Sequence, residues 1–193
     1  MIFDTHKIIV VAITKTGTTT IWRTLNDGSD PERNHWHGTV DELLERYGEE
    51  RFNTYRKISV IRNPYDRLWS CWKHTRLKDQ TIAEEGMVSR FRAFIKEELE
   101  NETENPHFRQ QYKQLLHEGQ TRIEDSPVDH IIRYEDGLDV EWKKLVDEYG
   151  ICPLIKQKWN VTVKIDEDPY DEETRKIVQD IYKMDFELLG YGK

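Results

Sequence analysis

Cysteine is scarce in this 193-residue sequence, and long apolar runs are missing. The two cysteines, Cys71 and Cys152, stand in dissimilar surroundings without metal-ligand spacing, so we expect reduced thiols rather than a disulfide framework. No apolar run approaches the roughly 20 residues needed to cross a bilayer, and residues 1–7 lack the basic and apolar pattern of a signal peptide. These absences predict a cytoplasmic protein that does not insert into a membrane.

Positive charge is in short supply as well. The 29 Lys and Arg residues stand against 37 Asp and Glu residues, which leaves a net charge of -8. Proteins that bind nucleic acids rely on clustered Lys and Arg, so this balance argues against a nucleic-acid partner. Internal repeats and low-complexity linkers are also missing, and 36% of the residues are hydrophobic, which is enough for a core. We therefore expect one folded domain over residues 1–193.

The apolar pattern predicts strands that alternate with helices. Unbroken apolar runs at residues 8–13, 58–61 and 128–132 are typical of buried parallel strands, and the alternation at residues 161–165 is typical of an edge strand. This order predicts an α/β fold with a central, mainly parallel sheet flanked by helices. Apolar residues at helical spacing predict the helices around residues 21–25, 40–47, 64–70, 88–99, 108–116, 142–149 and 177–182.

A polar loop, residues 14–20, follows the first buried run. Ligands of open parallel sheets bind beyond the carboxyl ends of the strands, so we expect this loop to face a ligand. Its backbone N–H groups, the positive end of the next helix, Gly17 and Lys15 suit a phosphate or a sulfate. The lysine precedes the glycine, so the loop is not the Walker A motif Gly-x-x-x-x-Gly-Lys-Ser/Thr. The alternative is that the loop has only a structural role, as a strand-to-helix turn with a capping threonine.

A guanidinium and a hydroxyl follow the second buried run. Arg62 ends that run, and Ser70 lies about two turns into a helix that Pro64 begins, so both side chains can point to the same end of the sheet. Together they suit a second, separate phosphate. A surface ion pair for Arg62 and a helix-surface position for Ser70 explain each residue alone, but not their joint spacing. Structural pairing is the better explanation for the neighbouring Arg67.

These two segments resemble a known family. Residues 14–20, Thr-Lys-Thr-Gly-Thr-Thr-Thr, resemble the 5′-phosphosulfate loop of PAPS-dependent sulfotransferases. Residues 60–70, Val-Ile-Arg-Asn-Pro-Tyr-Asp-Arg-Leu-Trp-Ser, resemble their 3′-phosphate motif in the form of the carbohydrate sulfotransferase branch. Weaker blocks at residues 37–43, 132–136 and 185–191 follow in the family's order. The resemblance implies a P-loop NTPase-like, three-layer fold.

The resemblance also implies an activity. The protein would transfer a sulfuryl group from PAPS (3′-phosphoadenosine 5′-phosphosulfate) to an acceptor hydroxyl by in-line displacement and release 3′,5′-ADP, without a metal. The acceptor would be a carbohydrate or a small alcohol. Lys15 would stabilise the charge that grows on the leaving phosphate, while Arg62 and Ser70 would hold the 3′-phosphate. The expected donor site consists of Lys15, Thr16, Gly17, Thr18, Thr19, Thr20, Arg62 and Ser70.

The acceptor hydroxyl needs a general base, and histidine titrates near neutral pH. His37 lies in a block that matches the family and just before a predicted helix, so it is our candidate for the base. His35 and Glu135 are the alternatives. A metal site at His35 and His37 would need a third ligand that the spacing does not supply.

Two other functions stay open at this point. A P-loop-type phosphotransferase would also place a strand, a loop and a helix around a phosphate, but the Walker A order and a clear metal-binding Asp are missing. A relative that binds a nucleotide or a glycan without catalysis is the second alternative. The polar stretch at residues 73–125 is the expected acceptor wall. Its neighbours Trp69 and Trp72 are either sugar contacts or core residues.

Overall fold

The computed structural model describes residues 1–26, 37–76, 86–154 and 167–192. The chain divides into two compact units, and each is described by itself. The sheet unit consists of Met1–Arg62 and Gln111–Trp159, and the helical unit consists of Asn63–Gln110 and Asn160–Lys193. The single domain over residues 1–193 stays a prediction.

The sheet unit has a four-stranded sheet in the described residues, with the strand order β1-β2-β3-β4. β2, β3 and β4 run parallel, and β1 pairs with β2 in the antiparallel sense, so the sheet is mixed. The three predicted buried strands are confirmed, whereas the hairpin strand β1 was not expected. The predicted edge strand at residues 161–165 lies outside the described residues. The strands are β1 (Ile2–Phe3), β2 (Ile8–Val11), β3 (Arg56–Ile61) and β4 (His130–Arg133).

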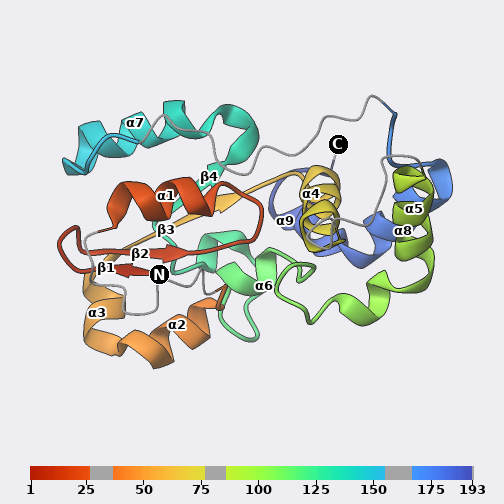
Figure 1. The fold of residues 1–193 in the computed structure, drawn as a ribbon. Helices are drawn as coiled ribbons and strands as arrows, with labels where there is room; N and C mark the ends of the chain where they lie inside the picture. Colours follow the sequence, from red (N-terminus) through yellow and green to blue (C-terminus); the bar gives the residue numbers. More distant parts are fainter. Residues whose placement is uncertain (27–36, 77–85, 155–166, 193) are drawn as a thin grey trace. The chain divides into compact units, whose positions relative to one another are not determined.

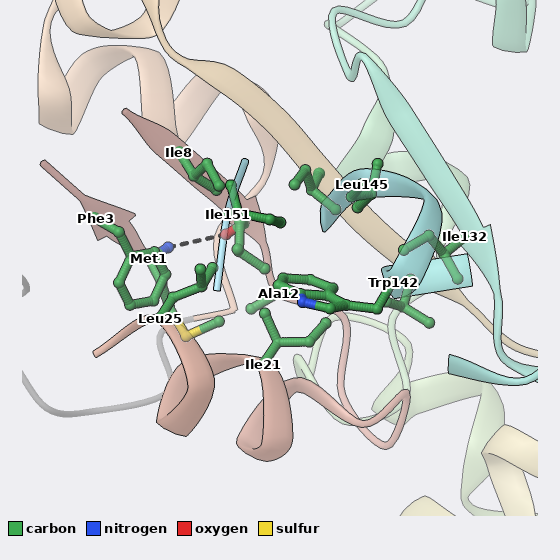
Figure 2. Packing of buried hydrophobic residues seen from close by; sticks show 13 residues of the cluster. Met1, Phe3, Ile8, Ala12, Ile21, Leu25, Ile132, Trp142, Leu145 and Ile151 are labelled. Carbon is green, nitrogen blue, oxygen red and sulfur yellow. Dashed lines mark hydrogen bonds between the residues drawn. The ribbon is translucent and has the colours of Figure 1, made fainter. Parts of the chain in front are cut away.

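Helices cover both faces of this sheet, which explains why its strands read as unbroken apolar runs. Figure 1 shows α1 (Thr18–Leu25) and α7 (Leu138–Tyr149) on one side of the sheet, and α2 (Val40–Tyr47) and α3 (Glu49–Thr54) on the other. Figure 2 shows the core on the α1 side, where Trp142 of α7 packs among mainly aliphatic residues such as Ala12 and Ile21. An α/β fold with helices flanking the sheet is therefore confirmed.

Some local signals in the sheet unit were clear and others were weak. The side chain of Thr39 accepts the backbone N–H of Glu42, whose own side chain accepts the N–H of Thr39, and this capping box begins α2 where the sequence predicts it. α3 was missed, because it has six mostly polar residues and buries only Phe52. The helix predicted over residues 108–116 was wrong in extent. The structure has α6 (Tyr112–Leu115) there, and the short 3-10 helices η3 (Ile123–Asp125) and η4 (Tyr134–Asp136) follow it.

The helical unit begins where the sequence predicts. The side chain of Asn63 accepts the N–H of Tyr65 at 3.0 Å, and Pro64 takes the first helical position, where it has no hydrogen bond to lose. No helix in the described part of the chain has the length and apolar character to cross a membrane. The helices of this unit are α4 (Pro64–Arg76), α5 (Met87–Glu97), η2 (Leu99–Glu102), α8 (Glu172–Ile181) and α9 (Lys183–Leu188).

Aromatic rings fill the core of the helical unit. The ring centroid of Phe91 lies 4.7 Å from that of Trp69, 5.3 Å from that of Trp72 and 5.2 Å from that of Tyr170. Packing therefore accounts for both tryptophans, which the sequence left open as sugar contacts. Arg67 is fully buried and its guanidinium donates to two backbone carbonyls, at 3.3 and 2.6 Å, which agrees with the expected structural role.

Candidate functional site: a loop and an arginine beyond the parallel strands

The loop after β2 has an unusual backbone. Lys15 and Gly17 both have a positive φ, 62° and 87°, and this conformation is uncommon for a residue with a side chain such as Lys15. Between them, Thr16 is fully buried, and its hydroxyl donates to the carbonyl of Ile13 at 2.9 Å. Backbones that turn through the left-handed region can direct successive N–H groups to one point, which is how proteins form anion-binding nests.

Gly17 is also the residue that begins α1. As the N-cap residue, glycine offers no side-chain cap, and the first turn of α1 contains no acidic residue. The alternative explanation of this loop, a strand-to-helix turn capped by a threonine, therefore does not hold, because the N-cap residue is glycine. A Cβ at Gly17 would lie 3.1 Å from a methyl group of Leu138 and 3.5 Å from the ring of Tyr134. Uncapped N–H groups and the helix dipole make the start of α1 suitable for an anion.

Arg62 lies against this loop. Its Nη1 donates to the carbonyl of Lys15 at 3.2 Å, and its guanidinium carbon lies 4.7 Å from the ring centroid of Tyr134. Its Nε is buried and has no hydrogen-bond partner among the described residues. The ion pairs of that part of the chain do not include Arg62, so the alternative of a surface ion pair finds no support there. The guanidinium thus contacts a carbonyl oxygen and an aromatic ring, neither of which carries a negative charge.

The backbone of Arg62 is held by a side chain that the sequence did not point to. The N–H of Arg62 donates to Oε1 of Gln111 at 2.9 Å, and Nε2 of Gln111 donates to the carbonyl of Arg62 at 2.8 Å. Gln111 is fully buried. It is 49 residues from Arg62, and no pattern in the sequence connects the two positions.

His37 lies against the carboxyl end of β2. Its Nδ1 is 2.8 Å from the carbonyl oxygen of Ala12, the residue after β2. A carbonyl oxygen only accepts, so Nδ1 carries the proton, and in a neutral ring Nε2 is then the basic nitrogen. Gln114, which is fully buried, donates from Nε2 to the carbonyl of His37 at 3.0 Å. His37 thus presents the tautomer that a base acting through Nε2 needs.

The other predicted site residues have different surroundings. Ser70 is buried on α4, in the helical unit, so its joint phosphate site with Arg62 stays a prediction. Glu135 is exposed in η4, directly after β4, and His35 lies outside the described residues. In the first turn of α1, Thr18 is buried, while Thr19 and Thr20 are half-buried.

The cationic side chains and hydrogen-bond donors of the loop and of Arg62 suit a ligand with two anionic groups. Lys15 and Arg62 supply two cationic side chains, and the start of α1 supplies backbone N–H groups without a side-chain cap. The buried Nε of Arg62 is a donor that a phosphate oxygen could use. Among the described residues, no group of three or more His, Cys, Asp or Glu side chains could hold a metal ion.

Comparison with known proteins gives one match. The family model described as "Sulfotransferase family" matches residues 1–138, well over half of the 193-residue chain. The match includes the loop at Lys15, His37, Arg62 and Ser70, and it ends before the predicted block at residues 185–191. No curated protein and no solved structure matches the chain. The chain therefore belongs to the sulfotransferase family, whose members transfer sulfuryl groups from PAPS.

Proposed function

We propose that this protein transfers a sulfuryl group from PAPS to a hydroxyl group of a carbohydrate or a small alcohol and releases 3′,5′-ADP. The observation that carries the proposal is the contact of Arg62 with the loop of Lys15 beside the uncapped start of α1. This contact brings the guanidinium of Arg62 to the backbone of the loop that carries Lys15, beyond the ends of adjacent parallel strands. The alternation of β2, loop and α1 also favours a P-loop NTPase-like, three-layer arrangement of the sheet unit.

The reaction would be an in-line displacement at sulfur. A bond forms between the acceptor oxygen and the sulfur, and the bond from the sulfur to the oxygen of the 5′-phosphate breaks. Negative charge then grows on the leaving phosphate. Donors that are already in place lower the barrier most at such a position, and Lys15, the N–H groups of the loop and the hydroxyls of Thr18, Thr19 and Thr20 would supply them.

The second anion of the donor would bind at Arg62. Its Nε is buried without a partner among the described residues, and a buried donor of this kind gains from a phosphate oxygen. Ser70 would supply a hydroxyl to the same phosphate. Recognition of a 3′-phosphate explains why PAPS, and not ATP, would be the donor.

His37 would remove the proton of the acceptor hydroxyl through Nε2. The hydrogen bond from Nδ1 to the carbonyl of Ala12 supports this role, because it leaves Nε2 as the basic nitrogen. Glu135 remains the alternative base. It is exposed, and its turn, η4, contacts the loop through the ring of Tyr134.

The experiment is transfer of labelled sulfate from PAPS to a panel of carbohydrate and small alcohol acceptors, together with thermal shift measurements. We expect transfer to at least one acceptor and stabilisation by 3′,5′-ADP without a metal. Stabilisation by ATP with magnesium alone would identify a phosphotransferase instead. Tight binding of 3′,5′-ADP without transfer to any acceptor would identify a relative that binds but does not catalyse.

A further inference from the structure

We infer that Gln111 and Gln114 are positioning residues that hold Arg62 and His37 in place from one short segment, the turn of α6. The inference rests on the proposed function, because it gives both glutamines a role in the same donor and base sites. Neither glutamine touches the reacting atoms in this scheme. They act through the backbone of Arg62, which would bind the 3′-phosphate, and through that of His37, which would act as the base.

Gln111 replaces a missing strand partner. The pairing of β3 with β4 ends at Ile61 and Arg133, so Arg62 is the first residue of this segment beyond the ladder. Its N–H and its carbonyl both bond to the one amide of Gln111, at 2.9 and 2.8 Å. Buried backbone groups need partners, and a primary amide is the side chain that can accept and donate at once. The position of Arg62 relative to its strand is therefore set by Gln111.

Gln114 connects His37 to the end of β2. Its Nε2 donates to the carbonyl of His37 at 3.0 Å and lies 3.5 Å from the carbonyl of Ala12. The same carbonyl of Ala12 receives the Nδ1 proton of His37. His37 is thus fixed to Ala12 twice, once through its ring and once through its backbone. Oε1 of Gln114 is buried without a partner among the described residues, so the donor end of the amide carries the contacts.

The spacing of the two glutamines explains how one turn reaches two strand ends. Residues three apart lie on the same side of a helical turn, and the backbone N–H of Gln114 donates to the carbonyl of Gln111 at 3.0 Å. β2 and β3 are neighbours in the sheet, with Val11 opposite Ser59. The buried side chain of Leu115 anchors the turn in the core. One rigid segment therefore sets both residues relative to adjacent strands.

The test uses the substitutions Gln111→Met and Gln114→Met, which keep the side-chain length and remove the amide. Gln110→Met is the matched control, because Gln110 also donates to a backbone carbonyl, that of Ile181, but within the helical unit. We expect Gln111→Met to lower the affinity for 3′,5′-ADP about tenfold and to have a smaller effect on turnover at saturating PAPS. We expect Gln114→Met to lower turnover by about tenfold or more and to leave the affinity for 3′,5′-ADP unchanged. The control should change neither.

A second measurement does not depend on activity. Hydrogen exchange of the Arg62 amide should be faster in Gln111→Met than in the wild type and unchanged in Gln114→Met. Nitrogen NMR of the His37 ring should show the Nδ1–H tautomer in the wild type and a mixture of tautomers in Gln114→Met. If the wild type transfers no sulfate, the proposed function fails, while these two readouts still decide whether the glutamines position Arg62 and His37.

The inference is wrong if both Gln→Met variants lose affinity and turnover in the same proportion, or if neither differs from Gln110→Met. If Gln111→Met does not fold, Gln111→Glu replaces it. A carboxylate there still accepts the N–H of Arg62 but cannot donate to its carbonyl, so the same selective loss of affinity for 3′,5′-ADP is expected. An affinity equal to that of the wild type would then overturn the role of Gln111.

Discussion

The sheet unit buries mainly aliphatic side chains between a sheet and its helices, whereas the helical unit buries aromatic rings between helices. The two units also differ in where their buried polar groups form hydrogen bonds. In the sheet unit, Thr16, Gln111 and Gln114 bond to backbone carbonyls just beyond the ends of parallel strands. In the helical unit, the hydroxyl of Tyr182 donates to the carbonyl of Phe108 at 2.6 Å, and that of Tyr170 donates to the carbonyl of Tyr65 at 2.7 Å.

This difference separates two roles of buried polar groups. Burial raises the pKa of both tyrosine hydroxyls in the helical unit well above the ordinary value, so they remain donors over the whole neutral range. They connect segments that are far apart in the sequence, and no predicted nucleotide contact except Ser70 lies in that unit. The polar groups of the sheet unit bond to the segments that carry Lys15, His37 and Arg62. Changes in the sheet unit should therefore alter binding and turnover, and changes in the aromatic core should alter stability.

Phe91→Ala is expected to have the largest effect of the substitutions that test this difference, and we expect it to lower the stability of the protein. Phe91 is fully buried among three aromatic rings, and truncation of such a side chain leaves a cavity that costs about 3–5 kcal/mol. Urea unfolding followed by fluorescence measures the loss. Val140→Ala on α7 is the control, because Val140 is 56% exposed and should change stability by less than about 0.5 kcal/mol. The comparison of the two units is weakened if the folded Phe91→Ala protein also binds 3′,5′-ADP poorly.

Lys15→Ala should lower turnover by roughly 10²-fold or more with little change in stability, because Lys15 would act on charge that develops in the transition state. The chain offers a close control in Lys7→Ala. Lys7 and Lys15 flank β2 at opposite ends, and both have a positive φ, 51° and 62°. The two substitutions therefore share their backbone cost, and only the one at the loop should affect sulfate transfer. Equal turnover in the two variants would remove Lys15 from the mechanism.

Arg62→Ala should lower the affinity for 3′,5′-ADP by about tenfold or more. The affinity for 5′-AMP, which has no 3′-phosphate, should not change. Isothermal titration with both nucleotides measures the difference. Arg56→Ala is the matched control, because Arg56 begins β3 and stacks on Tyr149 at 4.1 Å, much as Arg62 follows β3 and stacks on Tyr134 at 4.7 Å. If Arg62→Ala weakens both nucleotides equally, its contact with the loop is structural only.

The sequence predicted what depends on local patterns. Buried runs located β2, β3 and β4, and the strand ends placed the loop of Lys15 and Arg62 at the same edge of the sheet. The tertiary contacts of the site were out of reach. Gln111 and Gln114 meet Arg62 and His37 across 49 and 77 residues, and one polar residue before a four-residue helix and one within it give no periodic signal. β1 and α3 were missed because two apolar residues or six mostly polar ones fit a loop equally well.

Asp168→Asn is expected to have the smallest effect, and it tests the comparison through pH. The N–H of Tyr170 and the guanidinium of Arg175 bond to this carboxylate at 3.0 and 2.7 Å and lower the pKa of Asp168 below its ordinary value. The folded state then binds the proton less readily than the unfolded state does, so the contribution is present above the unfolded pKa and is lost as the pH falls through the folded one. The side chain is 58% exposed, and solvent screening limits the contribution to less than about 1 kcal/mol. Urea unfolding should show the variant less stable than the wild type at pH 7 and a smaller difference at pH 2, with Asp180→Asn on α8 as the control. A constant difference at both pH values would mean that the loss comes from packing and not from charge.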